Sequence, residues 1–183
     1  LPVCFLVWSI VKLEDGKARL AGIFLGMALS AKLSMFAAIP FILIYLYRNK
    51  RLVSNITPLL GFISLTYFIT IIPFLNSNSF IEMVIRTPEK ERLFSVFIDY
   101  GYNLKLFLLP TAYFVILYLI WRLEKITLDL FLISVGLGFF ALLLFLPPAP
   151  GWFAWIIPFL VFYQMRSRDQ YLVTTLPFFG IYL

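Results

Sequence analysis

The stretch that decides the fold class is residues 126–146, which reads ITLDLFLISVGLGFFALLLFL. Its only charged residue is Asp129, close to its start. A helix needs about 20 apolar residues to cross a bilayer, and hydrocarbon admits only helices or closed barrels because backbone polar groups must be paired internally. The stretch lacks the alternation of apolar and polar residues that is typical of a barrel strand. We therefore expect a transmembrane helix.

Apolar stretches of this kind recur along the whole chain. The chain is 62% hydrophobic and only 13% charged, whereas soluble domains carry roughly 25% charged residues. This pattern predicts an all-α fold, a polytopic transmembrane helix bundle that forms a single domain over residues 1–183. We expect an integral, multi-pass protein, located in the cell membrane of a prokaryote. The chain begins at Leu1 without a Met and stops inside an apolar run, which favours a fragment of a longer chain. Besides residues 126–146, the apolar stretches are 1–13, 18–47, 53–75, 106–121, 152–163 and the residues from 171 onward.

Basic residues lie between these stretches and set the expected orientation. Three short clusters, at residues 48–51, 122–125 and 166–169, are rich in Lys and Arg, and such loops stay in the cytoplasm. Residues 76–105 and 147–151 then lie outside. We therefore interpret the net charge of +6 as membrane topology and expect no nucleic-acid partner.

Residues 18–47 are too long for one simple span between these loops. If residues 12–19 are cytoplasmic as well, residues 18–47 form a broken pair of short helices that turns near residues 29–34. Small residues, Gly22 and Gly26 among them, would let the two halves pack closely. The alternative is one long, tilted helix that is kinked at Pro40.

Lys32 lies far from either end of this stretch. A lysine at membrane depth is unfavourable by about 3 kcal/mol, so its presence suggests a function. At the tip of a broken pair it would bind an anion such as a lipid phosphate, and Ser34 would add a hydrogen-bond donor. The alternatives are a lysine that snorkels to the interface and an ion pair with a carboxylate elsewhere.

The outer loop, residues 76–105, is the second candidate. Thr87 and Pro88 are typical of a helix start, and apolar residues continue the pattern through Phe97. We expect one or two amphipathic helices on the outer membrane surface. Arg86 and Arg92, with Glu82 and Asp99, would line a cleft there and contact a phosphate or polar substrate. The alternative is a solvated surface helix.

The third candidate is the aromatic stretch after the proline-rich turn at residues 147–151. Trp152 and Trp155 are typical of an aromatic belt at the membrane interface, or they form the apolar wall of a sugar site. Other chemistries find no support. The chain has no His and one Cys, and it lacks phosphate-loop, dinucleotide and Cys/His metal motifs, so no metal ligand can be named. Asp129 is interpreted as a charge at a helix N-terminus.

Two stretches resemble a known family. Residues 22–34, GIFLGMALSAKLS, followed by Pro40-Phe41, and residues 150–160, PGWFAWIIPFL, are similar to stretches of polytopic GT-C glycosyltransferases, such as the polyprenyl-phosphate-mannose-dependent mannosyltransferases. In that family a small-residue helix ends at a lysine and a proline-containing helix follows. Pro150 and Gly151 depart from the family, which often has a His or another polar residue there.

The resemblance implies an enzyme that transfers a sugar from a polyprenyl-phosphate carrier to a glycan, lipid or protein acceptor at the outer membrane face. Lys32 would contact the carrier phosphate. The family's catalytic acid lies in a first outer loop, which would precede Leu1, and a divalent metal remains possible as a cofactor. The alternative functions are a polytopic transporter or lipid flippase and a non-catalytic scaffold subunit.

Overall fold

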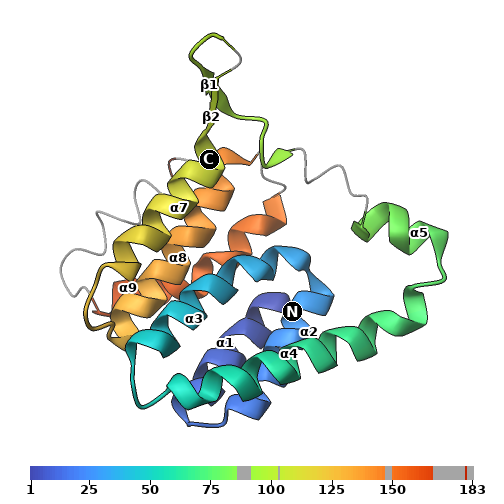
Figure 1. Cartoon of the computed structure of the whole chain (residues 1–183), viewed down its shortest axis with the longest axis vertical. Helices are drawn as coiled ribbons and strands as arrows, with labels where there is room; N and C mark the ends of the chain where they lie inside the picture. The colour runs from blue at the N-terminus through green and yellow to red at the C-terminus, as the bar shows by residue number, and fades with distance from the viewer. Residues whose placement is uncertain (86–91, 103, 147–149, 167–179, 181–183) are drawn as a thin grey trace.

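The computed structural model describes residues 1–85, 92–102, 104–146, 150–166 and 180, and this part of the chain is mostly helical (Figure 1). The fold class predicted from composition, all-α, is therefore confirmed for the described residues. The α-helices are α1 (Pro2–Glu14), α2 (Ala18–Ala31), α3 (Ile39–Arg48), α4 (Ile56–Ile71), α5 (Asn78–Phe80), α7 (Leu108–Trp121), α8 (Leu128–Phe145) and α9 (Ile157–Arg166). Short helical segments are η1 (Leu33–Ala38), η2 (Val53–Asn55), η3 (Ile72–Phe74), η4 (Ile81–Ile85) and η5 (Pro150–Trp155), and two strands are β1 (Phe97–Asp99) and β2 (Lys105–Phe107).

A glycine corner joins α1 to α2. Gly16 has a φ of +74°, a conformation that glycine adopts without strain. The backbone N–H of Lys17 donates to the carbonyl of Lys12 at 2.9 Å, which is the pattern of a helix that ends in a Schellman motif. Ser9 Oγ then donates to the carbonyl of Ala21 at 2.8 Å, so α1 and α2 are held side by side.

The chain breaks between α2 and α3, at Lys32. Lys32 has extended backbone angles (φ −161°, ψ 120°) between the end of α2 and the start of η1. Pro40 lies in the first turn of α3, where its missing N–H is tolerated. Tyr45 Oη, near the end of α3, donates to Glu14 Oε1 at 2.6 Å, and Glu14 is the last residue of α1. The chain therefore runs out along α2, turns at Lys32 and returns along α3, rather than continuing as one long helix.

The small residues of α2 pack against α4. A Cβ atom at Gly22 would lie 2.7 Å from the carbonyl oxygen of Leu59, and one at Gly26 would lie 2.7 Å from Thr66 Cβ. These glycines bring the backbones of α2 and α4 together, as small residues do between membrane helices. The expectation that they pack the two halves of the broken pair against each other is wrong, because their faces are already occupied by α4.

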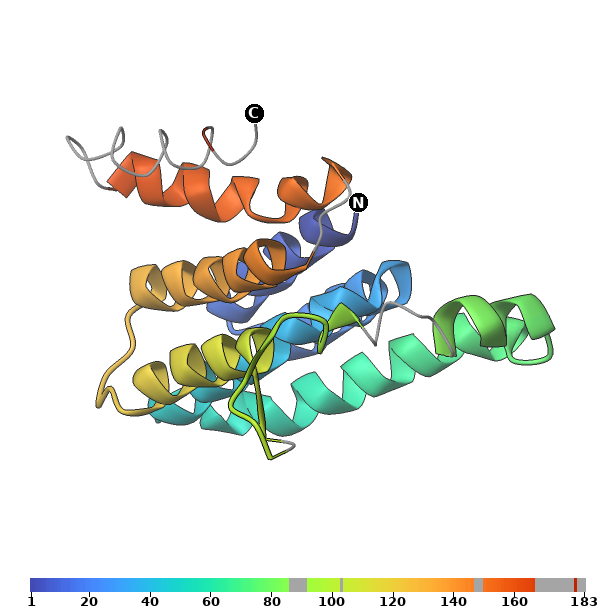
Figure 2. The ribbon, with the colours of Figure 1, turned by 90° about the horizontal axis from the view of Figure 1, so that it is seen from above.

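Helix α8 occupies the middle of the other half of the bundle. A Cβ atom at Gly138 would lie 2.6 Å from Phe41 Cε2 on α3, and one at Gly136 would lie 2.9 Å from Phe159 Cβ on α9. These glycines let aromatic rings from both neighbours approach the helix. Figure 2 shows α8 and α3 between α9 and α4, which lie at opposite edges. The largest fully buried side chains include Phe41, Phe131, Phe139, Leu25, Leu29 and Met35.

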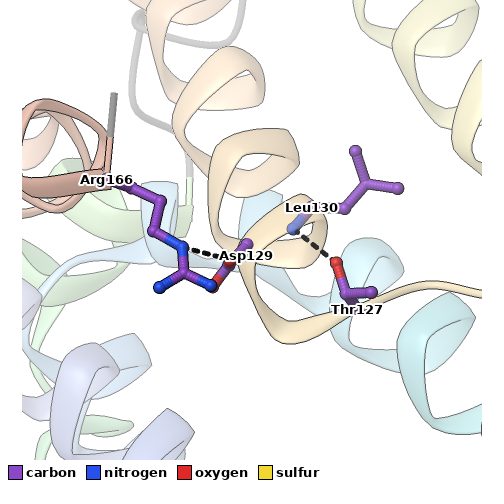
Figure 3. A network of polar contacts seen from close by, with 4 residues as sticks. All are labelled: Thr127, Asp129, Leu130 and Arg166. Atoms are coloured by element: carbon purple, nitrogen blue, oxygen red, sulfur yellow. Dashed lines mark hydrogen bonds and ion pairs between the residues drawn. The ribbon is translucent and has the colours of Figure 1, made fainter. Parts of the chain in front are cut away.

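Residues at or beside the three predicted basic clusters gather at one end of this bundle, and Arg166 is the described residue of the third cluster. The Arg48 guanidinium donates to the carbonyl of Trp121 and lies 4.8 Å from its ring centroid. Asn49 Nδ2 donates to the carbonyl of Ile126 at 3.2 Å. Arg166 Nε lies 2.8 Å from Asp129 Oδ2 in the first turn of α8, beside the cap in which Thr127 Oγ1 accepts from Leu130 N–H at 3.3 Å (Figure 3). Loops that are far apart in the sequence therefore share one end, which is here called the basic end.

The segment between α4 and α7 differs from the expectation. Residues Asn78–Phe80 and Ile81–Ile85 are helical, and residues 86–91, where Thr87 was expected to cap a helix, lie outside the described residues. The expected helical continuation through Phe97 is wrong. Phe97 pairs with Phe107 in an antiparallel hairpin, whose turn has positive φ at Gly101 (+81°) and Tyr102 (+52°). Figure 1 shows this hairpin projecting beyond the start of α7.

Two helical stretches of the described chain are long and apolar enough to cross a membrane, Val53–Phe74 and Leu128–Phe145. Only 11% of the most apolar part of Val53–Phe74 is buried inside the molecule. Phe68, Ile69 and Ile72 on this stretch are each about 60% exposed. An apolar surface of this extent is unusual for a protein that water surrounds.

Candidate functional site

The candidate site lies at the end of α2 and α3 opposite to the basic end, and it begins with Lys32. Its Nζ atom lies 4.5 Å from the ring centroid of Trp152 and 4.5 Å from that of Trp155. The two rings are stacked, with centroids 5.0 Å apart and planes inclined by 18°. An ammonium group is attracted to the faces of aromatic rings within about 6 Å. The half-buried cation is thus held beside two stacked indoles.

The tryptophans are held by α8 and by the short helix η5. Trp155 is only 4% exposed, and its ring packs edge-on against Phe139 of α8 with centroids 6.3 Å apart. Trp152 is half-buried. A lipid-facing aromatic belt requires exposed rings, so the buried position of Trp155 argues against that alternative. Residues 152–155 also belong to η5, whereas a continuous helix over residues 152–163 was expected.

An apolar cavity of about 470 Å³ adjoins the two tryptophans. Ligand cavities commonly have volumes of about 300–1,000 Å³, with mostly apolar walls and few polar groups. The walls come from η1, α7, α8, η5 and the residues just after position 92. They are Leu33, Ser34, Phe36, Ala37, Leu93, Phe94, Leu109, Pro110, Tyr113, Phe114, Leu142, Leu146, Trp152 and Trp155.

Ser34 supplies a polar atom in this apolar wall. Its Oγ atom is buried and has no hydrogen-bond partner among the described residues. A buried hydroxyl without a partner is unfavourable by about 1–3 kcal/mol, so such atoms are rare in folded proteins. A rotation of the side chain toward the cavity would let this hydroxyl bond to a ligand there.

Tyr113 fixes the wall between α7 and η1. Its Oη atom donates to the carbonyl of Ala37 at 2.7 Å, and its ring packs edge-on against Phe41 with centroids 5.6 Å apart. A buried tyrosine needs a partner for its hydroxyl. Sequence reasoning did not single out this residue, although a tyrosine inside the apolar stretch 106–121 was the signal available.

The structure brings together only some of the residues that the sequence suggested. Lys32 and Trp152 are in contact, and Ser34 lines the same cavity as Trp152. Arg92 is exposed and does not line the cavity, although its neighbours Leu93 and Phe94 do. Arg86 lies outside the described residues.

Two acidic residues expected beside Arg92 are also placed elsewhere. Glu82 and Asp99 are exposed and absent from the cavity wall. Glu82, Arg92 and Asp99 therefore do not contribute to this cavity, and the charged cleft that includes Arg86 stays a prediction. In the part of the chain that the structure describes, no group of three or more His, Cys, Asp or Glu side chains is arranged to hold a metal ion.

The arrangement suits one class of ligand. It combines a cation, a buried hydroxyl and a long apolar wall, so an anionic headgroup would lie against Lys32 and an apolar chain would fill the cavity. Comparisons with protein-family models, curated proteins and solved structures gave no match to this chain.

Proposed function

We propose that this chain belongs to a polytopic membrane glycosyltransferase, and that Lys32, Ser34 and the tryptophans bind the phosphate and first isoprene units of a polyprenyl-phosphate sugar donor. The observation that carries the proposal is the Lys32 ammonium, 4.5 Å from two stacked tryptophan rings, next to an apolar cavity of about 470 Å³. The enzyme class itself comes from the resemblance to GT-C glycosyltransferases.

Charge provides the first support for the proposal. A lysine is a compact point charge and a frequent phosphate ligand. In hydrocarbon such a charge is unfavourable unless it has a polar or anionic counterpart. The indole faces attract the ammonium through cation–π contacts, which contribute about 0.5–2 kcal/mol. A lipid phosphate beside Nζ would add a charge-assisted hydrogen bond.

The wall of the cavity provides the second support. Its aromatic and aliphatic side chains match an isoprenoid chain, and the Ser34 hydroxyl would donate to a phosphate oxygen. The stretch Val53–Phe74, which includes α4, and helix α8 would cross the bilayer completely. The shorter apolar helices Ala18–Ala31, Leu33–Arg48 and Leu108–Trp121 would complete a multi-pass bundle, with the basic end in the cytoplasm and Lys32 near the outer surface.

The test measures sugar transfer by membranes that contain the full-length protein with Lys32→Gln. A hydrogen bond to a charged group contributes about 1.5–3 kcal/mol, so we expect transfer from radiolabelled polyprenyl-phosphate mannose to fall about 10- to 100-fold. Lys32→Arg keeps the charge and should retain more transfer than Lys32→Gln. Unchanged transfer by Lys32→Gln at normal protein levels would refute the role of Lys32.

Lys12→Gln is the matched control. Lys12 also lies over a tryptophan, with Nζ 5.6 Å from the Trp8 ring centroid, but it is located on α1 near the basic end and pairs with Asp15. We expect normal transfer from this variant. Equal loss in both variants would indicate a general effect of lysine removal rather than a site at Lys32.

One observation favours a second function, a lipid flippase or transporter. The broken pair α2–α3, with its extended residue at Lys32, has the discontinuous form that transporters use at their binding sites. The two functions differ in outcome. A flippase would move a fluorescent polyprenyl phosphate between the leaflets of vesicles without consuming sugar, whereas a glycosyltransferase would release the carrier phosphate.

A further inference from the structure

A second groove runs along α7 and adjoins the candidate site, because Pro110 and Phe114 line both. It encloses about 470 Å³. Its walls are made mainly by Lys105, Phe107, Pro110, Phe114, Val115 and Tyr118. The residues from position 110 onward follow one another at helical spacing, so the groove is parallel to the helix axis. Among the described residues that line the groove, Lys105 in strand β2 is the one that carries a charge.

The groove has a charged end and an apolar body. Lys105 is exposed, and its Nζ atom lies 4.5 Å from the Phe97 ring centroid across the hairpin. Asp99 is opposite Lys105 in the strand register, but its carboxylate accepts from the backbone N–H of Gly101 at 2.8 Å. The turn therefore engages this carboxylate, and of the two charged side chains Lys105 is the one that lines the groove.

The dimensions match one leaflet of a membrane. From Leu108 to Tyr118 the helix is about 15 Å long at 1.5 Å per residue, which is half of a hydrocarbon core roughly 30 Å thick. Phe114 and Tyr118 are 66% and 58% exposed, so their rings form ridges beside the groove rather than part of the protein core. An acyl chain fits such a surface better than a folded protein partner, whose interface would need satisfied polar groups.

We infer that this groove binds one anionic phospholipid, with its phosphate at Lys105 and one acyl chain along α7. The inference rests on the membrane location proposed above, but not on glycosyltransferase activity or on the cavity at Lys32. The ordered lipid would cover the face of α7 and join the hairpin to the bilayer surface. Attraction of anionic lipids by basic residues next to a membrane is well established.

The test uses the full chain in nanodiscs made from equal parts of phosphatidylcholine and phosphatidylglycerol. After release into mild detergent, retained lipid is measured by native mass spectrometry. We expect the unchanged chain to retain phosphatidylglycerol in preference to phosphatidylcholine. Lys105→Gln should lower that retention about fivefold, the effect of one basic charge next to anionic lipid. Lys105→Arg should restore it.

Two further variants make the outcome specific. Val115→Trp places a large ring in the exposed groove and should reduce retention without removing a charge. Lys50→Gln removes an exposed charge at the basic end and should leave retention unchanged. Equal retention by Lys105→Gln and the unchanged chain, equal loss in Lys50→Gln, or equal retention of both lipids would each overturn the assignment. Failure of the chain to enter nanodiscs would instead refute the proposed membrane location.

Discussion

The contact of α2 with α4 gives a sharp prediction for Gly22→Ala. The added Cβ atom would lie 2.7 Å from the carbonyl oxygen of Leu59 and 2.7 Å from Phe62 Cβ. Real Cβ atoms essentially never approach so closely, and the first obstacle is backbone, which moves only if α4 moves. Overpacking of this kind destabilises proteins by about 1–3 kcal/mol. We therefore expect Gly22→Ala to loosen the whole α2–α4 contact.

Gly61→Ala is the matched control, because it makes the same chemical change in a helix with open surroundings. A Cβ atom at Gly61 on α4 would have no neighbour within 4 Å. Both variants gain the same helix propensity, about 1 kcal/mol for glycine to alanine. The difference between the two variants therefore isolates the packing contribution, and that difference should equal the full 1–3 kcal/mol or so expected from overpacking.

The assay is thermal unfolding of both purified variants in one detergent, followed by tryptophan fluorescence. For a chain of this size about 1 kcal/mol changes Tm by about 2–4 °C. Gly22→Ala should thus melt about 2–12 °C below Gly61→Ala. If Gly22→Ala melts at the same temperature as Gly61→Ala or above it, the close approach of α2 and α4 at Gly22 is refuted.

Three further variants test other contacts. Ser34→Ala removes a buried hydroxyl that has no partner among the described residues. Without ligand, Tm should therefore rise by the equivalent of about 1 kcal/mol, and the variant should bind polyprenyl phosphate in nanodiscs more weakly. A lower Tm would contradict this. Tyr113→Phe loses the 2.7 Å hydrogen bond to Ala37 and should lower the free energy of unfolding by about 1 kcal/mol; an unchanged Tm would show that this contact does not hold α7 to η1. Arg166→Gln breaks an exposed ion pair with Asp129 and should change stability by less than about 1 kcal/mol; a larger loss would mean that the pair closes the basic end.

Much of the helical layout follows from the lengths of the apolar runs. The runs at residues 53–75 and 126–146 correspond to Val53–Phe74 and Leu128–Phe145, because a long apolar run with at most one charge has few other ways to pair its backbone. The break expected near residues 29–34 includes Lys32, where the backbone is extended.

The hairpin was missed because its residues also fit the apolar side of an amphipathic helix. Phe97, Ile98 and Gly101 were nevertheless a signal, since aromatic and β-branched residues before a glycine turn favour strands. The apolar residues up to Phe97 also have helical spacing, which predicts a helix. In the structure the pairing of Phe97 with Phe107 outweighs that helical preference.

The candidate site was predictable only as separate residues. Lys32 and Trp152 each stood out, one as a charge in an apolar stretch and the other as an aromatic residue after a turn. Their contact depends on how α8 and η5 pack across the bundle, which periodicity does not encode. Periodicity likewise does not encode the hydrogen bond from Tyr113 to Ala37 or the packing of the α2 glycines against α4.

The narrow contact between α2 and α4 has a consequence for how this sequence can evolve. The residues of α4 that meet α2 include Leu59, Ile63, Thr66 and Thr70, a stripe that recurs every three to four positions. Other positions of α4, such as Leu65, Phe68 and Ile69, are exposed, so any apolar side chain serves equally well there. Saturation mutagenesis of α4 would accordingly show intolerance with helical periodicity along this stripe and near-neutral drift elsewhere. Selection would thus preserve the geometry of the helix pair while most of the residues of α4 change.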